Sequence, residues 1–368
     1  MTRRPTPASG LTLLFAAALI VHAAIAGAQA QDPAPYTLHV YTSLIQVPAL
    51  VLSANRKPLP PIPLQNFDIS LDAGPTFHPT QMRLEGDDPL SLAILLDASV
   101  DQDSMAKNFA TALASLSPGF LHPQDHVTVY VMDCVLVRSI NDAPATAAVL
   151  RGGIVGALAF PTLHGKKSRP ACGSKLRLWD SITRITMTLS DLPGRRVLLI
   201  ASDGVDGGSQ NKWSDLVHFA SLNSVSIFGL RNPDLSTISN RMSQRFGRGL
   251  SGFSTTGQDP HEDLFQALCE LNGGMILSTR AKDLTRNLES FVTLVRNRYI
   301  LEFPRANDAP PGPHNIQVTI PKTNAFITTA GVVVPLADPK LLADPNTVPS
   351  DPTQVKFGTR RPLDASPR

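Results

Sequence analysis

The chain has 368 residues with a formal net charge of +3, and 42% of the residues are hydrophobic. This length allows one large domain with a smaller one, and the composition supports a buried core. The small net charge argues against nucleic acid as a partner, because such binding needs a strong excess of basic side chains.

Residues 1–30 have the pattern of a secretory signal peptide. Two arginines precede an apolar stretch from Leu11 to Ala26, and the small residues up to Ala30 provide an Ala-x-Ala cleavage site. The stretch is short for a membrane anchor, and no later segment is apolar enough to span a bilayer. We therefore expect a secreted or periplasmic protein whose net charge after cleavage is about +1.

Residues 36–88 form an N-terminal β segment in this interpretation. Apolar and polar residues alternate, and Pro and Gly clusters separate the runs. The expected strands cover 36–40, 45–52 and 67–71.

Residues 89–297 change to strands that alternate with helical periods. This order is typical of an α/β fold, a doubly wound and mostly parallel sheet with helices on both faces. The expected strands cover 91–96, 127–132, 135–140, 197–201, 224–230 and 275–277, with 127–132 and 135–140 paired as a hairpin. The expected helices cover 104–116, 143–158, 176–189, 213–222, 260–271 and 284–295.

Residues 298–335 contain further strands, expected over 298–303, 314–320 and 325–334, with no helix between them. We expect these strands to rejoin the N-terminal β segment and to complete a small β-sandwich. The tail, 336–368, is rich in proline and charge and is predicted to be disordered.

Two apolar strands each end in an aspartate. Asp97 follows the run 91–96, and Asp203 follows the run 197–201. The carboxyl ends of parallel strands form the edge where open α/β sheets bind ligands. Each aspartate alone would suit a helix cap or a turn, whereas the pair at matching strand ends favours a shared site. Oxygen ligands without neighbouring Cys or His suit a hard divalent cation, with Mg²⁺ before Zn²⁺.

Several stretches resemble one known family. They are Pro89-Leu-Ser-Leu-Ala-Ile-Leu-Leu-Asp97, Phe67-Asp-Ile-Ser-Leu71 and the strands over 299–318. Over residues 36–335 the chain resembles a von Willebrand factor A domain, in particular the secreted VWFA-related proteins of acidobacteria. The resemblance implies a Rossmann-like fold with a metal-ion-dependent adhesion site, which holds a divalent cation and binds a protein ligand.

The ligand set implied by the resemblance is degenerate. The family pattern Asp-x-Ser-x-Ser matches at Asp97 and Ser99, but Asp101 replaces the last serine. Asp203 matches the aspartate of the third loop. Leu176 stands where the family has a threonine, and leucine cannot bind a metal. A site for Mg²⁺ or Mn²⁺ built from Asp97, Ser99, Asp101 and Asp203 and a vestigial site both stay open.

The three cysteines are Cys134, Cys172 and Cys269. Cys269 lies in a helical apolar pattern and is predicted to be a core thiol. Cys134 and Cys172 lie near loops or strand ends, and export permits a disulfide, so we expect these two to pair.

The function expected from the sequence is non-enzymatic binding of a protein or extracellular matrix ligand. The alternative is a structural or envelope-assembly scaffold with a vestigial metal site. A secreted hydrolase is the third possibility, because the long loop 231–258 has no other explanation. The Gly-x-Gly-x-x-Gly pattern at 247–252 is a weak nucleotide signal, since it does not follow an apolar strand.

Overall fold

The structure is a computed structural model of the chain. It describes residues 39–41, 44–98, 103–133, 135–163, 177–233, 263–304, 312–330, 332–334 and 347–349. The predicted signal peptide lies outside these residues. The chain forms two compact units. In the smaller unit, β1 (His39–Tyr41) pairs in parallel with β16 (Thr347–Pro349), which belongs to the segment predicted as a disordered tail. The larger unit holds the other elements described below.

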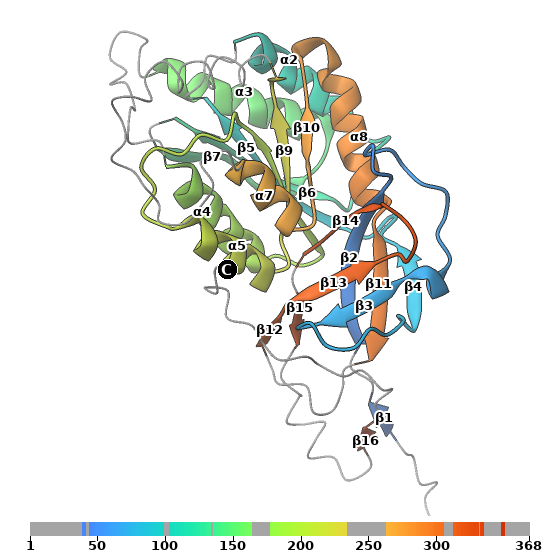
Figure 1. Cartoon of the computed structure of the whole chain (residues 1–368). Helices are drawn as coiled ribbons and strands as arrows, with labels where there is room; N and C mark the ends of the chain where they lie inside the picture. The colour runs from blue at the N-terminus through green and yellow to red at the C-terminus, as the bar shows by residue number, and fades with distance from the viewer. Residues whose placement is uncertain are drawn as a thin grey trace, which may run out of the picture. The chain divides into compact units, whose positions relative to one another are not determined.

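A six-stranded sheet forms the centre of the larger unit, in the order β10-β9-β8-β5-β6-β7 (Figure 1). All neighbouring strands are parallel except β6 and β7. From β5 the chain first builds β6 and β7 on one side, and then β8, β9 and β10 on the other. This reversal at β5 confirms the predicted doubly wound fold. The strands are β5 (Leu90–Asp97), β6 (His126–Met132), β7 (Leu136–Pro144), β8 (Arg195–Ala201), β9 (Ser226–Arg231) and β10 (Ile276–Ser278).

Helices cover both faces of this sheet because its central strands carry buried apolar side chains on both faces. In β5, Leu92 and Ile94 enter one core, and Ala93 and Leu95 enter the other. The first core is closed by α2 (Asp103–Ala114), α3 (Ala147–Leu163) and α8 (Leu284–Arg296). The second is closed by α4 (Leu178–Ser190), α5 (Trp213–Leu222) and α7 (Leu264–Leu271). Short 3₁₀ turns, η1 (Leu64–Asn66) and η3 (Ala281–Asp283), complete the helical segments.

Strand β7 is longer than predicted, and the following helix starts later. The helical pattern predicted a start at residue 143, but Ala143 and Pro144 still pair with β6. The hairpin contact therefore overrides the local helical preference, and α3 begins at Ala147.

The β region is built from strands at both ends of the larger unit. Its main sheet has the order β14-β2-β11-β4, and two further pairs are β13-β3 and β12-β15. β11 lies antiparallel between β2 and β4, so that Leu301 faces Val47 on one side and Met82 on the other. The strands are β2 (Leu44–Leu52), β3 (Asp68–Leu71), β4 (Gln81–Leu84), β11 (Tyr299–Pro304), β12 (Gly312–His314), β13 (Ile316–Thr319), β14 (Phe326–Thr329) and β15 (Val332–Val334).

Strand β2 serves two cores at once. Leu50 and Leu52 pack in the core that contains α8, whereas Val47, Ala49 and Val51 pack in the core of the β region. Successive side chains of a strand point to opposite faces, so an apolar run without alternation fits a strand buried on both sides. The β region and the α/β domain are joined through this strand.

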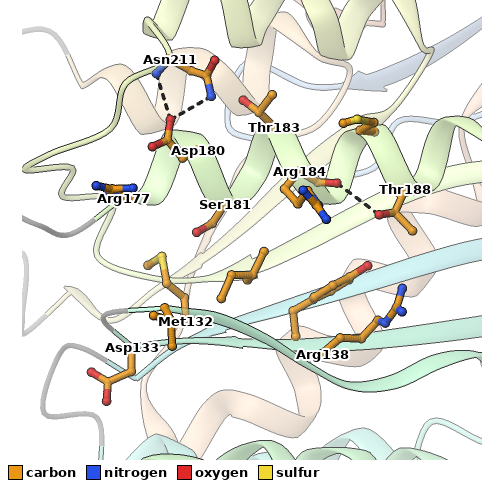
Figure 2. Close-up of a pocket in the computed structure, with 14 residues that line it drawn as sticks. Met132, Asp133, Arg138, Arg177, Asp180, Ser181, Thr183, Arg184, Thr188 and Asn211 are labelled. Carbon is orange, nitrogen blue, oxygen red and sulfur yellow. Dashed lines mark hydrogen bonds between the residues drawn. The ribbon is translucent and has the colours of Figure 1, made fainter.

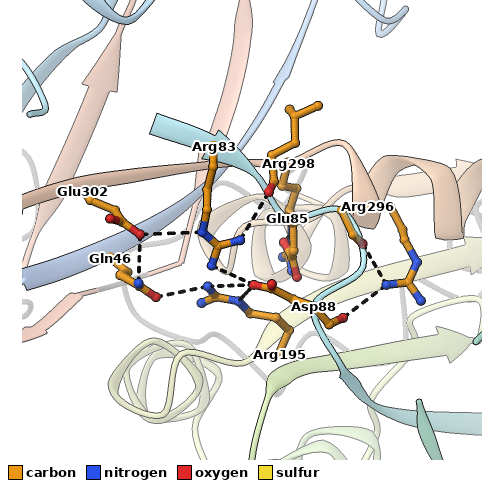
Figure 3. Close-up of polar contacts among 10 residues, drawn as sticks. Gln46, Arg83, Glu85, Asp88, Arg195, Arg296, Arg298 and Glu302 are labelled. Carbon is orange, nitrogen blue, oxygen red and sulfur yellow. Dashed lines mark hydrogen bonds and ion pairs between the residues drawn. The ribbon is translucent and has the colours of Figure 1, made fainter. Parts of the chain in front are cut away.

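A polar cluster fixes the connections between the two parts (Figure 3). Arg298, between α8 and β11, donates to both carboxylate oxygens of Glu85 at 2.7 and 2.8 Å, and both side chains are buried. Two residues earlier, Arg296 donates to Asp125 at 2.5 Å. Asp125 also accepts from the backbone N–H of Leu90, at the start of β5, at 3.0 Å. The two points where the chain passes between the β region and the α/β domain are therefore tied together.

Candidate metal centre at the carboxyl edge of the sheet

Asp97 lies where the sequence predicted, at the carboxyl end of β5, and only 4% of it is exposed. Its neighbour β8 runs parallel, with Leu96 opposite Ala201. The next residue of that chain segment, Ser202, is fully buried and donates its hydroxyl to Asp97 Oδ2 at 2.6 Å. This hydrogen bond fixes the orientation of the Asp97 carboxylate at the edge of the sheet.

The turn after β8 depends on Ser202 and Gly204. The Ser202 hydroxyl accepts from the backbone N–H of Gly204 at 3.0 Å. Gly204 has φ +85°, and a Cβ there would lie 2.6 Å from Cβ of Phe265 in α7. Only glycine fits both the backbone angle and the space. Asp203, held between them, is half-buried and accepts from the backbone N–H of Val205 at 3.2 Å.

The structure thus brings Asp97, at the end of β5, and Asp203, in the turn after the neighbouring β8, to the same edge of the sheet. Ser99 and Asp101, the other two predicted ligands, lie outside the described residues, as does Leu176. Among the residues that the structure describes, no group of three or more His, Cys, Asp or Glu could hold a metal ion. The donors present are two carboxylates and the Ser202 hydroxyl. They fit a hard divalent cation by chemistry, and the ligand set would need the residues after Asp97 to complete it.

A second aspartate pair, which sequence reasoning missed, binds the neighbouring loop to α4. Asp206 Oδ1 accepts from the backbone N–H groups of Leu178 and Trp179, at 2.7 and 3.2 Å, and so caps α4 from a distant loop. In return, Asp180 in the first turn of α4 accepts from the backbone N–H groups of Gln210 and Asn211.

This reciprocal contact sets where α4 begins relative to the loop that carries Asp203. Asp180 alone could have been noticed as an acidic residue in a first helical turn. The partner of Asp206 is 28 residues away and cannot be read from local sequence.

Cys269 lies fully buried in α7 and is a free thiol, as predicted. Burial raises the pKa of this thiol far above its usual value. Cys134 and Cys172 lie outside the described residues, so their pairing stays a prediction. Within the described part of the chain, no helix is both long and apolar enough to cross a bilayer.

No family model matches the sequence, and no curated protein matches it. Solved structures do align with the chain. Proximal thread matrix protein 1 from the mussel byssus, with zinc in its MIDAS motif, aligns at 10% identity and a TM-score of 0.38, over 58% of this chain and 49% of that one. This chain thus spans about half the length of the mussel protein.

Two further structures come from a parasite and a bacterium. The manganese-loaded TRAP protein of Plasmodium vivax aligns at 11% identity and a TM-score of 0.33, over 68% of this chain and 95% of that one. The vWF domain of the type V pili tip protein Mfa5 of Porphyromonas gingivalis aligns at 12% identity and a TM-score of 0.25, over 32% and 39%. Because these TM-scores are below 0.5, we base the fold on the strand order of this chain. The aligned structures include a von Willebrand factor domain, the fold expected from the sequence.

Proposed function

We propose that this chain is an exported, non-enzymatic binding protein whose sheet edge holds Mg²⁺ or Mn²⁺. The observation that carries the proposal is the buried hydrogen bond from Ser202 to Asp97, with Asp203 next to Ser202 in the turn after the neighbouring strand. A carboxylate held by a buried hydroxyl at the reversal point of a doubly wound sheet is oriented in the place where such sheets bind ligands.

The chemistry of such a site is binding without turnover. A bound Mg²⁺ or Mn²⁺ would supply an electrophilic position that a carboxylate of a protein or matrix ligand can occupy. Asp97 and Asp203 would hold the ion, with Ser99 and Asp101 as the further ligands. The aspartate at 101 adds a negative charge where the family has a hydroxyl. It therefore either strengthens ion binding as a direct ligand or occupies the position meant for the partner.

The second candidate is a scaffold with a vestigial site. Two observations favour it. One oxygen of Asp97 is already engaged by Ser202, and Leu176 replaces the expected threonine. In this case the α/β domain would serve assembly through its surface, without a cation.

A calorimetric titration of the purified chain with MgCl₂ and MnCl₂ separates the two candidates. We expect heat of binding and a higher thermal midpoint, since a ligand that binds only the folded state stabilises it, by about 2.7 kcal/mol at a hundred times Kd. Asp97→Ala and Asp203→Ala should each abolish both signals. Asp87→Ala is the matched control, because that side chain is 84% exposed and precedes the start of β5, at the opposite end of the strand from Asp97.

Asp101→Ser tests the role of the extra carboxylate. If Asp101 is a ligand, this change weakens ion binding. If it occupies the open position, the change leaves ion binding intact and improves partner binding. The absence of heat and of a thermal shift at millimolar Mg²⁺ and Mn²⁺ would support the scaffold instead.

A further inference from the structure

A second feature of the α/β domain lies apart from the aspartates of the sheet edge. A groove of about 800 Å³ runs between α4 and the strand pair β6–β7 (Figure 2). α4 and its N-cap residue Arg177 contribute one wall, as far as Thr188, and residues between Tyr130 and Arg138 line the other. The groove exists because α4 packs on β5 and β8, so the outer strands of the sheet are less covered on this face.

Three arginines line the groove from both walls. Arg184 comes from α4, Arg177 stands at the N-cap of this helix, and Arg138 comes from β7. Within the described residues, none of their guanidinium groups has a hydrogen bond or ion pair with a protein group. By contrast, Arg83, Arg296 and Arg298 elsewhere in the domain are all paired with carboxylates. The groove therefore concentrates positive charge that the described structure does not use.

The two carboxylates at the groove do not cancel this charge. Asp180 is occupied by the backbone N–H groups of Gln210 and Asn211 and by the Asn211 side chain at 2.8 Å. The Asp133 carboxylate points out of the space between the helix and the strands (Figure 2).

A buried hydroxyl adds an independent sign of a missing ligand. Tyr130 lines the groove and is 4% exposed, and its hydroxyl has no hydrogen-bond partner among the described residues. An unpaired buried hydroxyl costs about 1–3 kcal/mol, so most such groups in native proteins have partners. A ligand with an acceptor oxygen would remove this cost.

The spacing of the arginines favours an extended ligand. Arg177, at the N-cap of α4, and Arg184, within the helix, are seven residues apart, which is about 10.5 Å at the rise of a helix. A peptide in the polyproline II conformation advances about 3.1 Å per residue with three residues per turn, so side chains three residues apart lie on one face at a similar distance. Exposed apolar side chains, Val135 and Met187, also line the groove, and a peptide can cover these as well.

We propose that this groove binds an acidic peptide segment of a partner protein, with carboxylates on Arg138, Arg177 and Arg184 and apolar side chains on Val135 and Met187. The Tyr130 hydroxyl donates to one of the peptide's oxygens. This interaction does not involve the sheet-edge aspartates, so it goes beyond the cation-dependent binding proposed above and does not rest on it.

The test is fluorescence anisotropy in EDTA with a labelled peptide of about twelve residues. It carries Glu at every third position, so that these side chains share one face of a polyproline II helix, with Leu and Ser between. We expect binding that weakens as salt rises, and little binding of the same peptide with Gln for Glu. Arg184→Gln should weaken binding about tenfold or more, since a charge-assisted hydrogen bond is lost. Arg138→Gln, on the outer strand, provides an independent second variant.

Two controls separate the groove from general charge effects. Arg151→Gln removes the same charge from the exposed side of α3 and should leave binding unchanged. Tyr130→Phe should weaken binding several-fold without lowering the thermal midpoint, because the hydroxyl has no partner to lose. Equal binding of the Glu and Gln peptides, or equal binding by both arginine variants and wild type, would overturn the proposal. Tighter binding of heparin than of the Glu peptide would overturn it in favour of a polyanion site.

Discussion

Replacement of Arg298 by methionine should destabilise the chain strongly, because it leaves the buried carboxylate of Glu85 without its ion-pair partner. Arg298 and Glu85 are 1% and 0% exposed and make two hydrogen bonds of 2.7 and 2.8 Å. Arg298 also donates to the hydroxyl of Ser226 in β9. Arg298→Met keeps the apolar stem but leaves Glu85 without its partner in the interior.

The expected loss is about 3–5 kcal/mol of the free energy of unfolding, the range for breaking a buried ion pair from one side. That is a large part of the total of about 5–15 kcal/mol typical of folded proteins. A second change, Glu85→Leu, should restore most of the loss, because buried pairs replaced by apolar residues are often neutral.

Urea denaturation of the two single variants and the double variant measures these differences as a double-mutant cycle. Arg83→Met is the matched control. It breaks the pair with Asp88 at 2.8 Å, where the side chains are 41% and 32% exposed, and should cost no more than about 1 kcal/mol. Two results would contradict this prediction. One is a loss of unfolding free energy for Arg298→Met no larger than that for Arg83→Met, and the other is a double variant as unstable as Arg298→Met.

Three further predictions concern single residues. Gly204→Ala should lower the thermal midpoint more than Gly86→Ala, since both have positive φ but only the Cβ at 204 would collide with Phe265; equal shifts in the melting curves would contradict this. Hydrogen bonds from Arg231 hold the pKa of Asp263 below its usual value, so this carboxylate stabilises the fold above about pH 4 and the contribution is lost as pH falls towards the lowered pKa. The difference in thermal midpoint between wild type and Asp263→Asn should therefore be present at pH 7 and shrink in acid, and a difference independent of pH would argue against it. Finally, a thiol reagent should find no reactive thiol in the native exported chain and one after unfolding without reductant, because Cys269 is buried and Cys134 is expected to pair with Cys172; three thiols would rule out the disulfide.

The sequence predicted the sheet well because its central strands contain apolar runs, such as residues 92–96 of β5. It also placed Asp97 and Asp203 at the ends of strands that prove to be neighbours. The predicted boundary between β7 and α3 was wrong, because residues 143 and 144 pair with β6 and so continue the strand.

Contacts between distant segments could not be predicted. Asp206 caps a helix that starts 28 residues earlier, and Arg298 pairs with Glu85 across 213 residues. The arginines of the groove come from β7 and from α4 with its N-cap, and these elements lie opposite each other only in the folded chain. Each of these residues is an ordinary charged residue in the sequence, and its role comes only from its tertiary neighbour.

Because β2, β11 and β14 share one sheet, they determine how the larger unit would respond to mechanical tension. In the antiparallel pairs, Thr329 lies opposite Ala49 and Pro304 lies opposite Leu44. A force that pulls the chain apart on the two sides of this unit would therefore act on one end of the β2–β11 pair and of the β2–β14 pair. The hydrogen bonds between the paired strands would then break one after another. The α/β domain is inserted between β4 and β11 and carries no load until β11 has separated from β2. The β region would lengthen first under force, while the sheet edge with Asp97 and Asp203 keeps its shape.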